Sequence, residues 1–324
     1  KPMFDIKEDN GLVCLSGGEP FSPQHTFECG QCFRWRRSDR GGYVGVAGRH
    51  AARIWTDGDK TYITCERSEF ESFWRRYLDL DRSYTDISAA FASDDFTKQA
   101  VEYGRGLRIL RQEPWEALCS FIISQCNNIP RIQKIIDTLC GAFGDEIEFE
   151  GEKYRTFPSA ERIAGLGEHD LDILHAGYRA PYILNAARRT AAGEVDFSAV
   201  DRMDTPDAEK YIMSLNGVGR KVADCFLLFG MGKLDAFPVD TWMKKAAPYY
   251  KNGFDGKAFG EFAGIAQQYI FYFARSTKIG KRVDNDRAKA YNSSHYIKIG
   301  AGSWDVCRVT EMPGKKIRRG KNGQ

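Results

Sequence analysis

The sequence predicts an α+β protein in which an N-terminal antiparallel β-sheet domain with helices precedes an all-helical domain. Short β-rich runs broken by turn residues fill the first part of the chain, and beyond about residue 99 the apolar residues recur at helical spacing. The composition, 42% hydrophobic and 13% aromatic over 324 residues, supplies apolar side chains for one large or two modest cores. We expect domains at residues 1–98 and 99–280, followed by a basic, flexible tail at residues 281–324.

Three β-rich runs between residues 11 and 65 predict the N-terminal sheet. Turn residues separate them, and they cover residues 42–46, 53–56 and 61–65. The next segment, residues 69–77, places aromatic residues three and four apart, at Phe70, Phe73, Trp74 and Tyr77. That spacing predicts a helix that covers one face of the sheet.

Helical periodicity dominates the second part of the chain. Pro114 stands where a first helical turn tolerates proline, and an apolar stripe runs from Trp115 to Cys126. A second stripe runs from Ile132 to Cys140. Further helices are predicted at residues 179–192, 205–215, 221–229 and 257–274, with short loops between most of them.

The formal net charge of +3 conceals an asymmetry between the body and the end of the chain. Residues 281–324 hold 11 Lys and Arg against 4 Asp and Glu, so residues 1–280 hold 36 against 40. The body is therefore slightly acidic, and a nucleic-acid site on it must be a local basic surface.

Several classes of protein are disfavoured by the sequence. No run reaches the roughly 18 apolar residues of a membrane span, and the first ten residues lack the apolar run of a signal peptide, so we expect an intracellular protein. Of the nine cysteines only Cys29 and Cys32 form a close pair, and the five histidines show no metal-ligand spacing. We expect reduced thiols, no metal site and no cofactor.

The segment from Leu215 to Cys225 is the most informative. Gly217 and Gly219 allow a tight turn between two predicted helices, and the backbone N–H groups at the start of the second helix form a site for a phosphate. Taken alone, the pattern also fits an ordinary corner between helices. Nineteen residues after Lys221, Asp240 follows Pro238 and Val239 at the probable N-cap of another helix.

This combination resembles the helix-hairpin-helix DNA glycosylase superfamily, in which an essential Asp follows the hairpin. A lysine at the place of Lys221 is similar to the bifunctional branch, which also cleaves the abasic strand. The resemblance implies that Lys221 is the covalent nucleophile and that Asp240 lies beside it. It also implies DNA phosphate contacts by Gly217, Gly219, Lys221, Val222 and Trp242.

Elementary chemistry agrees with these two roles. An attacking amine must be neutral, and a place in the first turn of a helix, next to Arg220, disfavours the cationic form of Lys221. An ionised Asp240 would stabilise the positive charge that grows on the sugar as the glycosidic bond breaks. The alternative is that Asp240 caps a helix and does nothing else.

Further stretches resemble the 8-oxoguanine DNA glycosylases, which implies a TATA-binding-protein-like N-terminal domain. In the stretch from Phe27 to Trp35, the carbonyl of Gly30 would accept the N7 hydrogen that only the oxidised guanine carries. Gln267 and Phe271 lie four residues apart, on the helix face away from the apolar seam. The resemblance implies that Gln267 bonds the flipped base and that Phe271 stacks on it, with Cys225 on the opposite face. A plain strand start at Gly30 and domain packing by Phe271 are the alternatives.

The stretch from Ser124 to Arg131 resembles the turn that fills the hole left by the extruded base. The residues expected at the opposite base and its wedge are Asn127, Asn128, Arg131, Tyr178 and Arg179. Cys126 departs from the familiar pattern because an Asn there supplies a further contact to cytosine. Trp242 departs as well, since a phosphate-binding His is usual at its place.

Other functions remain open at this point. The endonuclease III and adenine glycosylase branches carry a four-cysteine iron–sulfur loop, whereas only Cys225 and Cys307 follow the hairpin here. Thymine glycol or an alkylated base is another possible substrate, and a non-catalytic hairpin module that only binds DNA is another class. We expect a monomer that acts on double-stranded DNA containing oxidised guanine, in the bacterial nucleoid or the eukaryotic nucleus.

Overall fold

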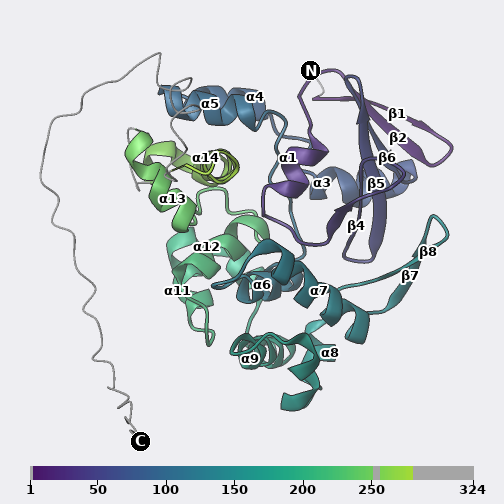
Figure 1. The fold of residues 1–324 in the computed structure, drawn as a ribbon, viewed down its shortest axis with the longest axis vertical. Coiled ribbons are helices and arrows are strands. Elements are labelled where there is room, and N and C mark those ends of the chain that lie inside the picture. Colours follow the sequence, from purple (N-terminus) through teal and green to yellow (C-terminus); the bar gives the residue numbers. More distant parts are fainter. Residues whose placement is uncertain (1–2, 251–255, 280–324) are drawn as a thin grey trace, which may run out of the picture. The chain divides into compact units, whose positions relative to one another are not determined.

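A six-stranded antiparallel sheet forms the first half of the fold in the computed structural model, which describes residues 3–250 and 256–279 (Figure 1). The predicted tail lies outside these residues. The strand order is β1-β2-β6-β5-β4-β3. The bounds are β1 (Asp5–Asp9), β2 (Leu12–Ser16), β3 (Trp35–Arg37), β4 (Tyr43–Ala47), β5 (His50–Asp57) and β6 (Lys60–Thr64).

The three strands predicted from sequence are β4, β5 and β6, and they form one continuous antiparallel ladder. Strands β1, β2 and β3 were not predicted individually. Neither the charged edge strand β1, with the sequence DIKED, nor the three-residue β3 shows the apolar alternation that marks a half-buried strand. Pairing with a neighbouring strand, which sequence periodicity does not report, makes them strands.

The helix predicted at residues 69–77 is confirmed, although its middle is wound as a π-helix. It consists of α2 (Arg67–Glu69), η1 (Phe70–Trp74) and α3 (Arg75–Tyr77). Phe70 and Trp74 are fully buried, and Trp74 meets Trp35 of β3 edge to face with ring centroids 6.0 Å apart. This helix therefore covers one face of the sheet, as the spacing of its aromatic residues predicts.

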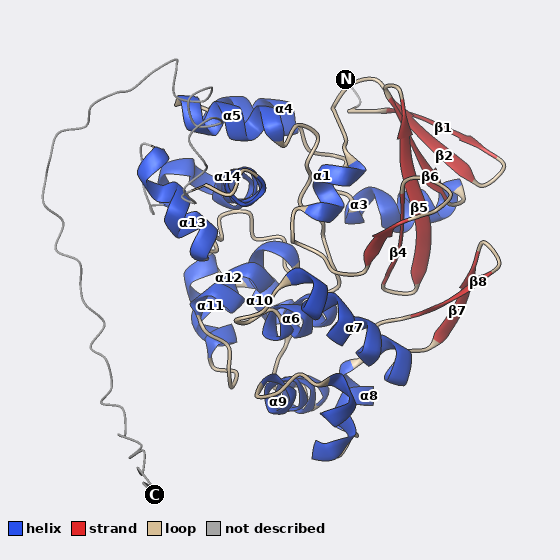
Figure 2. Ribbon diagram, viewed as in Figure 1, coloured by secondary structure: helices blue, strands red, loops and turns tan. Residues whose placement is uncertain are grey.

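Helices make up most of the rest of the described chain (Figure 2). They are α1 (Pro23–Glu28), α4 (Tyr84–Phe91), α5 (Asp95–Tyr103), α6 (Pro114–Ile123), α7 (Ile129–Phe143), α8 (Ala160–Ala164), η2 (Glu168–Leu174), α9 (Arg179–Ala191), α10 (Phe197–Arg202), α11 (Thr205–Met213), α12 (Arg220–Phe229), α13 (Thr241–Ala246), η3 (Ala247–Tyr249), η4 (Gly256–Phe262) and α14 (Ala263–Ser276). Pro114 is the first residue of α6. No helix in the described ranges is long and apolar enough to cross a membrane.

The helical part contains one β-hairpin, which the expectation of an all-helical domain did not include. Strands β7 (Glu146–Phe149) and β8 (Glu152–Arg155) pair with each other. Glu150 and Gly151 turn the chain with φ of 51° and 79°. Two successive positive φ angles are what a two-residue hairpin loop requires. Glu150 also pairs with Arg53 of the sheet at 3.1 Å, so a contact distant in sequence supports the hairpin.

The single helix predicted at residues 257–274 is wrong in its first part. A short 3₁₀ segment, η4, precedes α14, and Gly260 has the non-helical angles φ 63° and ψ −146°. Glycine adopts this conformation without the steric cost that a Cβ would bring. The break separates the two segments and lets α14 begin at Ala263.

Two hydrophobic cores lie inside the described part. One lies against the sheet, and the other joins α6, α7, α9, α11, α12 and α14. Tyr84, Phe91 and Phe96 of α4 and α5 belong to the helical core, although they precede residue 99 in the chain. Helix α5 contacts α14 directly, which brings the end of the sheet domain to the helix of Gln267 and Phe271.

Candidate active site

The hairpin joins α11 to α12 and leaves the start of α12 facing solvent. Val218 N–H donates to the Leu215 carbonyl at 3.1 Å, which closes the turn. Gly217 has φ +77°, and a Cβ there would lie 2.2 Å from the ring of Tyr182, so no larger residue fits. Gly219 is the exposed N-cap of α12. The first amides of α12 therefore lie at an exposed helix start, and a phosphate site there stays a prediction.

Lys221 lies in the first turn of α12, above the C-terminal end of α6. Its Nζ donates to Ser124 Oγ at 3.3 Å and lies 5.5 Å from the ring centroid of Phe121. Arg220, by contrast, is directed to Glu209 and Asp224, at 3.4 Å and 3.9 Å. Because these carboxylates balance its charge, the expected like-charge effect of Arg220 on Lys221 finds no support here. The helix N-terminus remains the argument for a reactive amine.

Asp240 is the N-cap of α13, as its sequence context predicts. Its Oδ1 accepts hydrogen bonds from the N–H groups of Trp242 and Met243, both at 2.9 Å. Two backbone donors on one oxygen fix the orientation of the carboxylate. The cap therefore holds the negative charge in one place, which a group that stabilises a developing cation needs.

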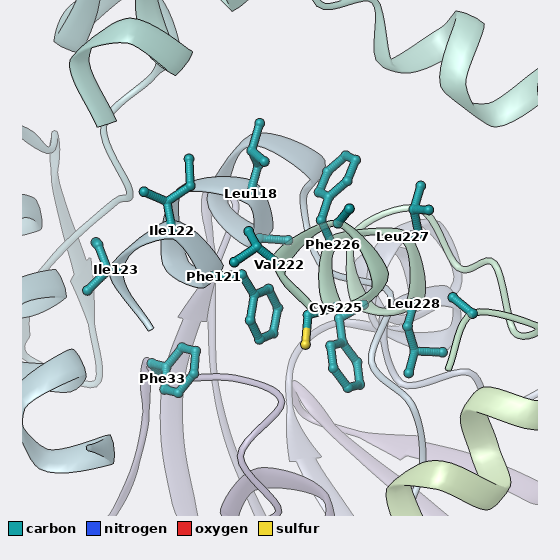
Figure 3. Close-up of a cluster of buried hydrophobic side chains, with 14 of the residues drawn as sticks. Phe33, Leu118, Phe121, Ile122, Ile123, Val222, Cys225, Phe226, Leu227 and Leu228 are labelled. Atoms are coloured by element: carbon teal, nitrogen blue, oxygen red, sulfur yellow. The ribbon is translucent and has the colours of Figure 1, made fainter. Parts of the chain in front are cut away.

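Cys225 lies one turn after Lys221, among the buried side chains between α6 and α12 (Figure 3). Burial raises the pKa of its thiol to about 11. The neighbouring Lys221 lowers this pKa, while the carboxylates of Asp224 and Asp240 raise it. The thiol therefore stays protonated at neutral pH, and both Lys221 and Asp240 lie within electrostatic reach of it. The fold brings together the three groups that the sequence placed up to 19 residues apart.

The loop that carries Gly30 meets α14 of the helical part. Gly30 has φ +89°, and a Cβ there would lie 2.6 Å from Arg275 Nη1 and 3.4 Å from Phe271 Cε1. Gln268 Nε2 donates to the Cys29 carbonyl at 3.0 Å, which ties the loop to the helix. Gly30 and Phe271, which are 241 positions apart in the sequence, therefore face each other across a gap that accepts no side chain at Gly30.

Gln267 is more deeply buried than the sequence analysis anticipated. Nearly every residue of α14 from Ala263 to Ala274 is buried, so the face that carries Gln267, away from the apolar seam, is packed as well. The helix is packed on all sides. Gln267 is 3% exposed, its Nε2 donates to the Pro238 carbonyl at 3.0 Å, and its Oε1 has no partner within the described structure. This bond ties Gln267 to the loop that ends in Asp240.

The turn between α6 and α7 is rigid and partly exposed. Asn127 Nδ2 donates to the Ile123 carbonyl at 3.1 Å, and Asn128 caps α7 by accepting from Arg131 N–H at 3.1 Å. Cys126 is exposed and has φ +45°. Tyr178 lies beside this turn with 51% of its surface exposed, as a wedge residue requires. The predicted wedge and turn are therefore neighbours in the fold.

The two arginines predicted at the opposite base differ in how many of their hydrogen-bond donors are already used. Arg131 is exposed, with one N–H on the His175 carbonyl at 3.3 Å. Arg179 is only 4% exposed, and its guanidinium donates to the carbonyls of Gln125, Ala176 and Cys126. In this structure Arg179 fixes the turn, and four of the five N–H donors of its guanidinium are engaged by backbone carbonyls. A bidentate contact from Arg179 to the orphaned base would require some of these bonds to be exchanged.

The remaining residues predicted to contact a DNA phosphate lie in the first turns of α12 and α13. The Val222 amide already donates to the Gly219 carbonyl at 3.0 Å and its side chain is buried, which leaves Gly219 and Lys221 better placed for a phosphate. Trp242, in the first turn of α13, is half-buried, and Lys245 Nζ lies 4.5 Å from its ring centroid. An indole and an ammonium thus stand together next to Asp240.

Comparison with known proteins agrees with this geometry. Residues 15–118 match the model of the 8-oxoguanine DNA glycosylase N-terminal domain, and residues 119–253 match that of the HhH-GPD superfamily base excision DNA repair proteins. The chain is 31% identical to a probable N-glycosylase/DNA lyase of Methanothermobacter thermautotrophicus, over 67% of this chain and 77% of the relative. The chain belongs to the 8-oxoguanine DNA glycosylase family.

Two further proteins of this family are similar to the chain over most of its length. An N-glycosylase/DNA lyase of Arabidopsis thaliana is 31% identical over 76% of this chain and 75% of that protein. The 8-oxoguanine glycosylase/lyase of Clostridium acetobutylicum, solved in complex with double-stranded DNA containing cytosine opposite 8-oxoguanine, is 36% identical with a TM-score of 0.80. That match covers 86% of this chain and all of the other.

The fold of this glycosylase adds residues that the sequence analysis missed. Ser124 holds the Lys221 amine, Pro238 accepts from Gln267, and Arg275 lies against Gly30. The sequence could have indicated Arg275, because it follows Gln267 and Phe271 at intervals of four residues and so shares their helix face. Within the described residues no group of His, Cys, Asp and Glu is arranged to hold a metal ion.

Asp224, in the second turn of α12, gives a prediction about stability. It lines a cleft of about 1000 Å³ together with Glu209 and Arg220. Burial raises its pKa from 3.8 to about 7; Glu209 raises it further and Arg220 lowers it. Between these two values the native state binds more protons than the unfolded state, so the free energy of unfolding falls as the pH rises from about 4 to about 7.

We expect Asp224→Asn to be more stable than the wild type at pH 8 and to lose much of this pH dependence. Three pKa units correspond to about 4 kcal/mol, which is the upper bound of the gain. Urea unfolding at pH 5 and pH 8 measures it, with the exposed Asp207→Asn on α11 as the control. If the wild type and Asp224→Asn show the same change in the free energy of unfolding between pH 5 and pH 8, the pKa of Asp224 is not raised.

Proposed function

We propose that this protein excises 8-oxoguanine from duplex DNA and then cleaves the strand at the resulting abasic site. The observation that carries the proposal is that Lys221 and Asp240 both lie near the buried thiol of Cys225. Helix α14 bonds the loop before Asp240 through Gln267 and meets the Gly30 loop through Gln268. The activities for which the two N-glycosylase/DNA lyase relatives and the Clostridium acetobutylicum enzyme are named support it.

Base removal begins when the target nucleotide leaves the stack, because its C1′ is inaccessible within a duplex. The Lys221 amine attacks C1′ as the bond from C1′ to N9 breaks. The electron pair of that bond leaves with the base, which takes up a proton from water. Asp240 stays fixed by its two backbone donors and stabilises the cationic character of the sugar.

Strand cleavage follows on the same lysine. The nitrogen then loses one of its two protons, the C1′–O4′ bond breaks, and O4′ takes up a proton, which leaves a protonated Schiff base between the lysine and C1′. Loss of a proton from C2′ then moves electrons toward the iminium and expels the 3′-phosphate, so the C3′–O bond breaks. Hydrolysis of the Schiff base by water regenerates the free amine of Lys221.

Discrimination between oxidised and ordinary guanine rests on the loop of Gly30. The carbonyl of Gly30 would accept the hydrogen that N7 carries only in 8-oxoguanine, while Phe271 and Cys225 enclose the two faces of the base. The positive φ of Gly30 and the tight approach of Phe271 support this role, since a Cβ would fill the gap. The polar edge of the base is then left for Gln267.

Borohydride trapping tests the proposal. Incubation with a duplex that holds 8-oxoguanine opposite cytosine, followed by borohydride, should yield a covalent protein–DNA adduct. Without borohydride, a denaturing gel of a sample that has not been heated should show the cleaved strand. A duplex with unmodified guanine at the same place is the control. Absence of an adduct with the 8-oxoguanine duplex, or equal trapping on the guanine duplex, contradicts the proposed function.

Cys126 gives a prediction about the opposite base. The residue is exposed in the turn beside Tyr178, and a thiol is a weak hydrogen-bond donor, so we expect modest preference for cytosine in the wild type. Cys126→Asn adds an amide where φ is positive, a conformation that Asn tolerates well. The preference for cytosine should rise about threefold to tenfold, the worth of one hydrogen bond.

Single-turnover excision of 8-oxoguanine opposite each of the four bases measures this preference. Cys14→Asn, at a half-buried cysteine on the distant strand β2, is the control for a cysteine-to-asparagine change. If Cys126→Asn leaves the ratio between cytosine and the other partners unchanged, the turn does not read the orphaned base.

A further inference from the structure

Arg275 occupies the same face of α14 as the two predicted base contacts. Gln267, Phe271 and Arg275 stand at intervals of four residues, so their side chains form one row along the helix. Eight residues of helix span about 12 Å. Because Gln267 bonds Pro238, two residues before Asp240, Arg275 is at the end of the row away from the catalytic carboxylate.

The guanidinium of Arg275 is held against the Gly30 loop and the Phe271 ring. One N–H, on Nη2, donates to the Glu28 carbonyl, and Cζ lies 5.2 Å from the ring centroid of Phe271. The other terminal nitrogen, Nη1, lies 2.6 Å from the place that a Cβ of Gly30 would take. Nη1 is buried and finds no acceptor among the residues that the structure describes.

Two polar atoms at opposite ends of Phe271 are therefore unsatisfied. Gln267 Oε1 is a buried acceptor without a donor, and Arg275 Nη1 is a buried donor without an acceptor. A buried polar group without a partner costs free energy, and such atoms at a binding site indicate what the missing ligand must offer. The ligand must present a hydrogen-bond donor near Gln267 and an acceptor near Arg275.

An 8-oxoguanine base meets both requirements. Its N1–H and N2–H groups are donors, and its O6 is an acceptor at the end of the base far from the sugar. Adenine carries an amino group in place of O6, so 8-oxoadenine would direct N–H groups at the guanidinium. Both oxidised bases carry O8 and the N7 hydrogen, so the Gly30 carbonyl alone does not separate them.

We propose that Arg275 is a specificity-determining residue that donates a hydrogen bond from Nη1 to O6 of the flipped base. The proposal rests on the function proposed above and extends it, because it adds a reader for the six-position of the purine. Gly30 selects the oxidised state at N7, and Arg275 selects guanine against adenine. The bond from Nη2 to Glu28 and the stacking on Phe271 hold the guanidinium in place before the base arrives.

Excision by Arg275→Leu is the first test. Single-turnover excision of 8-oxoguanine opposite cytosine should fall about tenfold to a hundredfold, the range expected for a lost charged hydrogen bond. Borohydride trapping on a preformed abasic site should not fall with it, because that substrate has no base to read. The control, Lys278→Asn, removes a positive charge from the exposed turn that follows α14, where φ is 54°, a conformation that Asn tolerates. Unchanged 8-oxoguanine excision by Arg275→Leu overturns the proposal.

Binding of two oxidised purines is the second test, made in a Lys221→Gln background that does not turn over. Dissociation constants are compared for duplexes with 8-oxoguanine or 8-oxoadenine opposite cytosine. We expect Arg275→Leu to reduce the preference for 8-oxoguanine about tenfold or more. A parallel loss on both duplexes, with the ratio unchanged, would mean that Arg275 only braces the Gly30 loop, and it overturns the proposal. Failure of the wild type to excise 8-oxoguanine at all would instead contradict the proposed function.

Discussion

Lys221→Gln should abolish the borohydride-trapped adduct and lower excision of 8-oxoguanine by on the order of a thousandfold or more. Glutamine is shorter than lysine by one bond and fits the site sterically, while it removes the amine that donates to Ser124 Oγ at 3.3 Å. An amide nitrogen is not a nucleophile, so no Schiff base can form. Single-turnover excision and gel detection of the adduct measure the two effects.

The matched control for this variant is Lys210→Gln on α11. Lys210 is exposed and pairs with Asp207 at 2.9 Å, so the substitution makes the same change in charge away from the chemistry. DNA binding by Lys221→Gln should remain measurable because the hairpin glycines are intact. Continued trapping by Lys221→Gln would show that another amine is the nucleophile.

Asp240→Asn should separate the charge of Asp240 from its capping function. Asparagine is as good an N-cap as aspartate, so the bonds to Trp242 and Met243 persist and the free energy of unfolding changes little. Loss of the negative charge removes the stabilisation of the cationic sugar. We expect excision to fall about a hundredfold to a thousandfold, the scale of losing one preorganised electrostatic group.

Asp240→Ala completes the comparison. It removes the charge and the cap together, so excision should fall at least as far and the free energy of unfolding should drop by about 1 kcal/mol. Asp204→Asn is the control, since Asp204 caps α11 through the same kind of bond, from Asp207 N–H at 2.8 Å. If Asp240→Asn retains full excision with unchanged stability, the carboxylate serves only as a cap.

Much of the helical part, and the local setting of Lys221 and Asp240, was predictable because the signals are local. The stripes at residues 115–126 and 132–140, the proline that begins α6 and the Asp240 cap each depend on residues within a few turns of one another. The hairpin is local as well, since Gly217 adopts a positive φ at the position where the sequence requires a tight turn. These features are confirmed.

Features that depend on partners distant in the chain were missed or misjudged. The edge strand β1 exists because it pairs with β2, and the hairpin of β7 and β8 meets the sheet through Glu150 and Arg53. The burial of Gln267 follows from packing of α14 on several sides, which its own periodicity does not reveal. The occupied guanidinium of Arg179 depends on carbonyls more than 50 residues away.

The sequence by itself determined the local setting of the two residues that we propose carry the chemistry, a lysine in the first turn of a hairpin helix and an aspartate at a helix cap, because short-range backbone geometry dictates both. Only the tertiary structure brought together the residues that we propose read the base. Gly30, Gln267 and Arg275 come from the two ends of the chain, and the unsatisfied Oε1 and Nη1 become visible only after folding has removed water from around them. Burial of polar atoms is a property of packing, and spacing along the chain does not encode it.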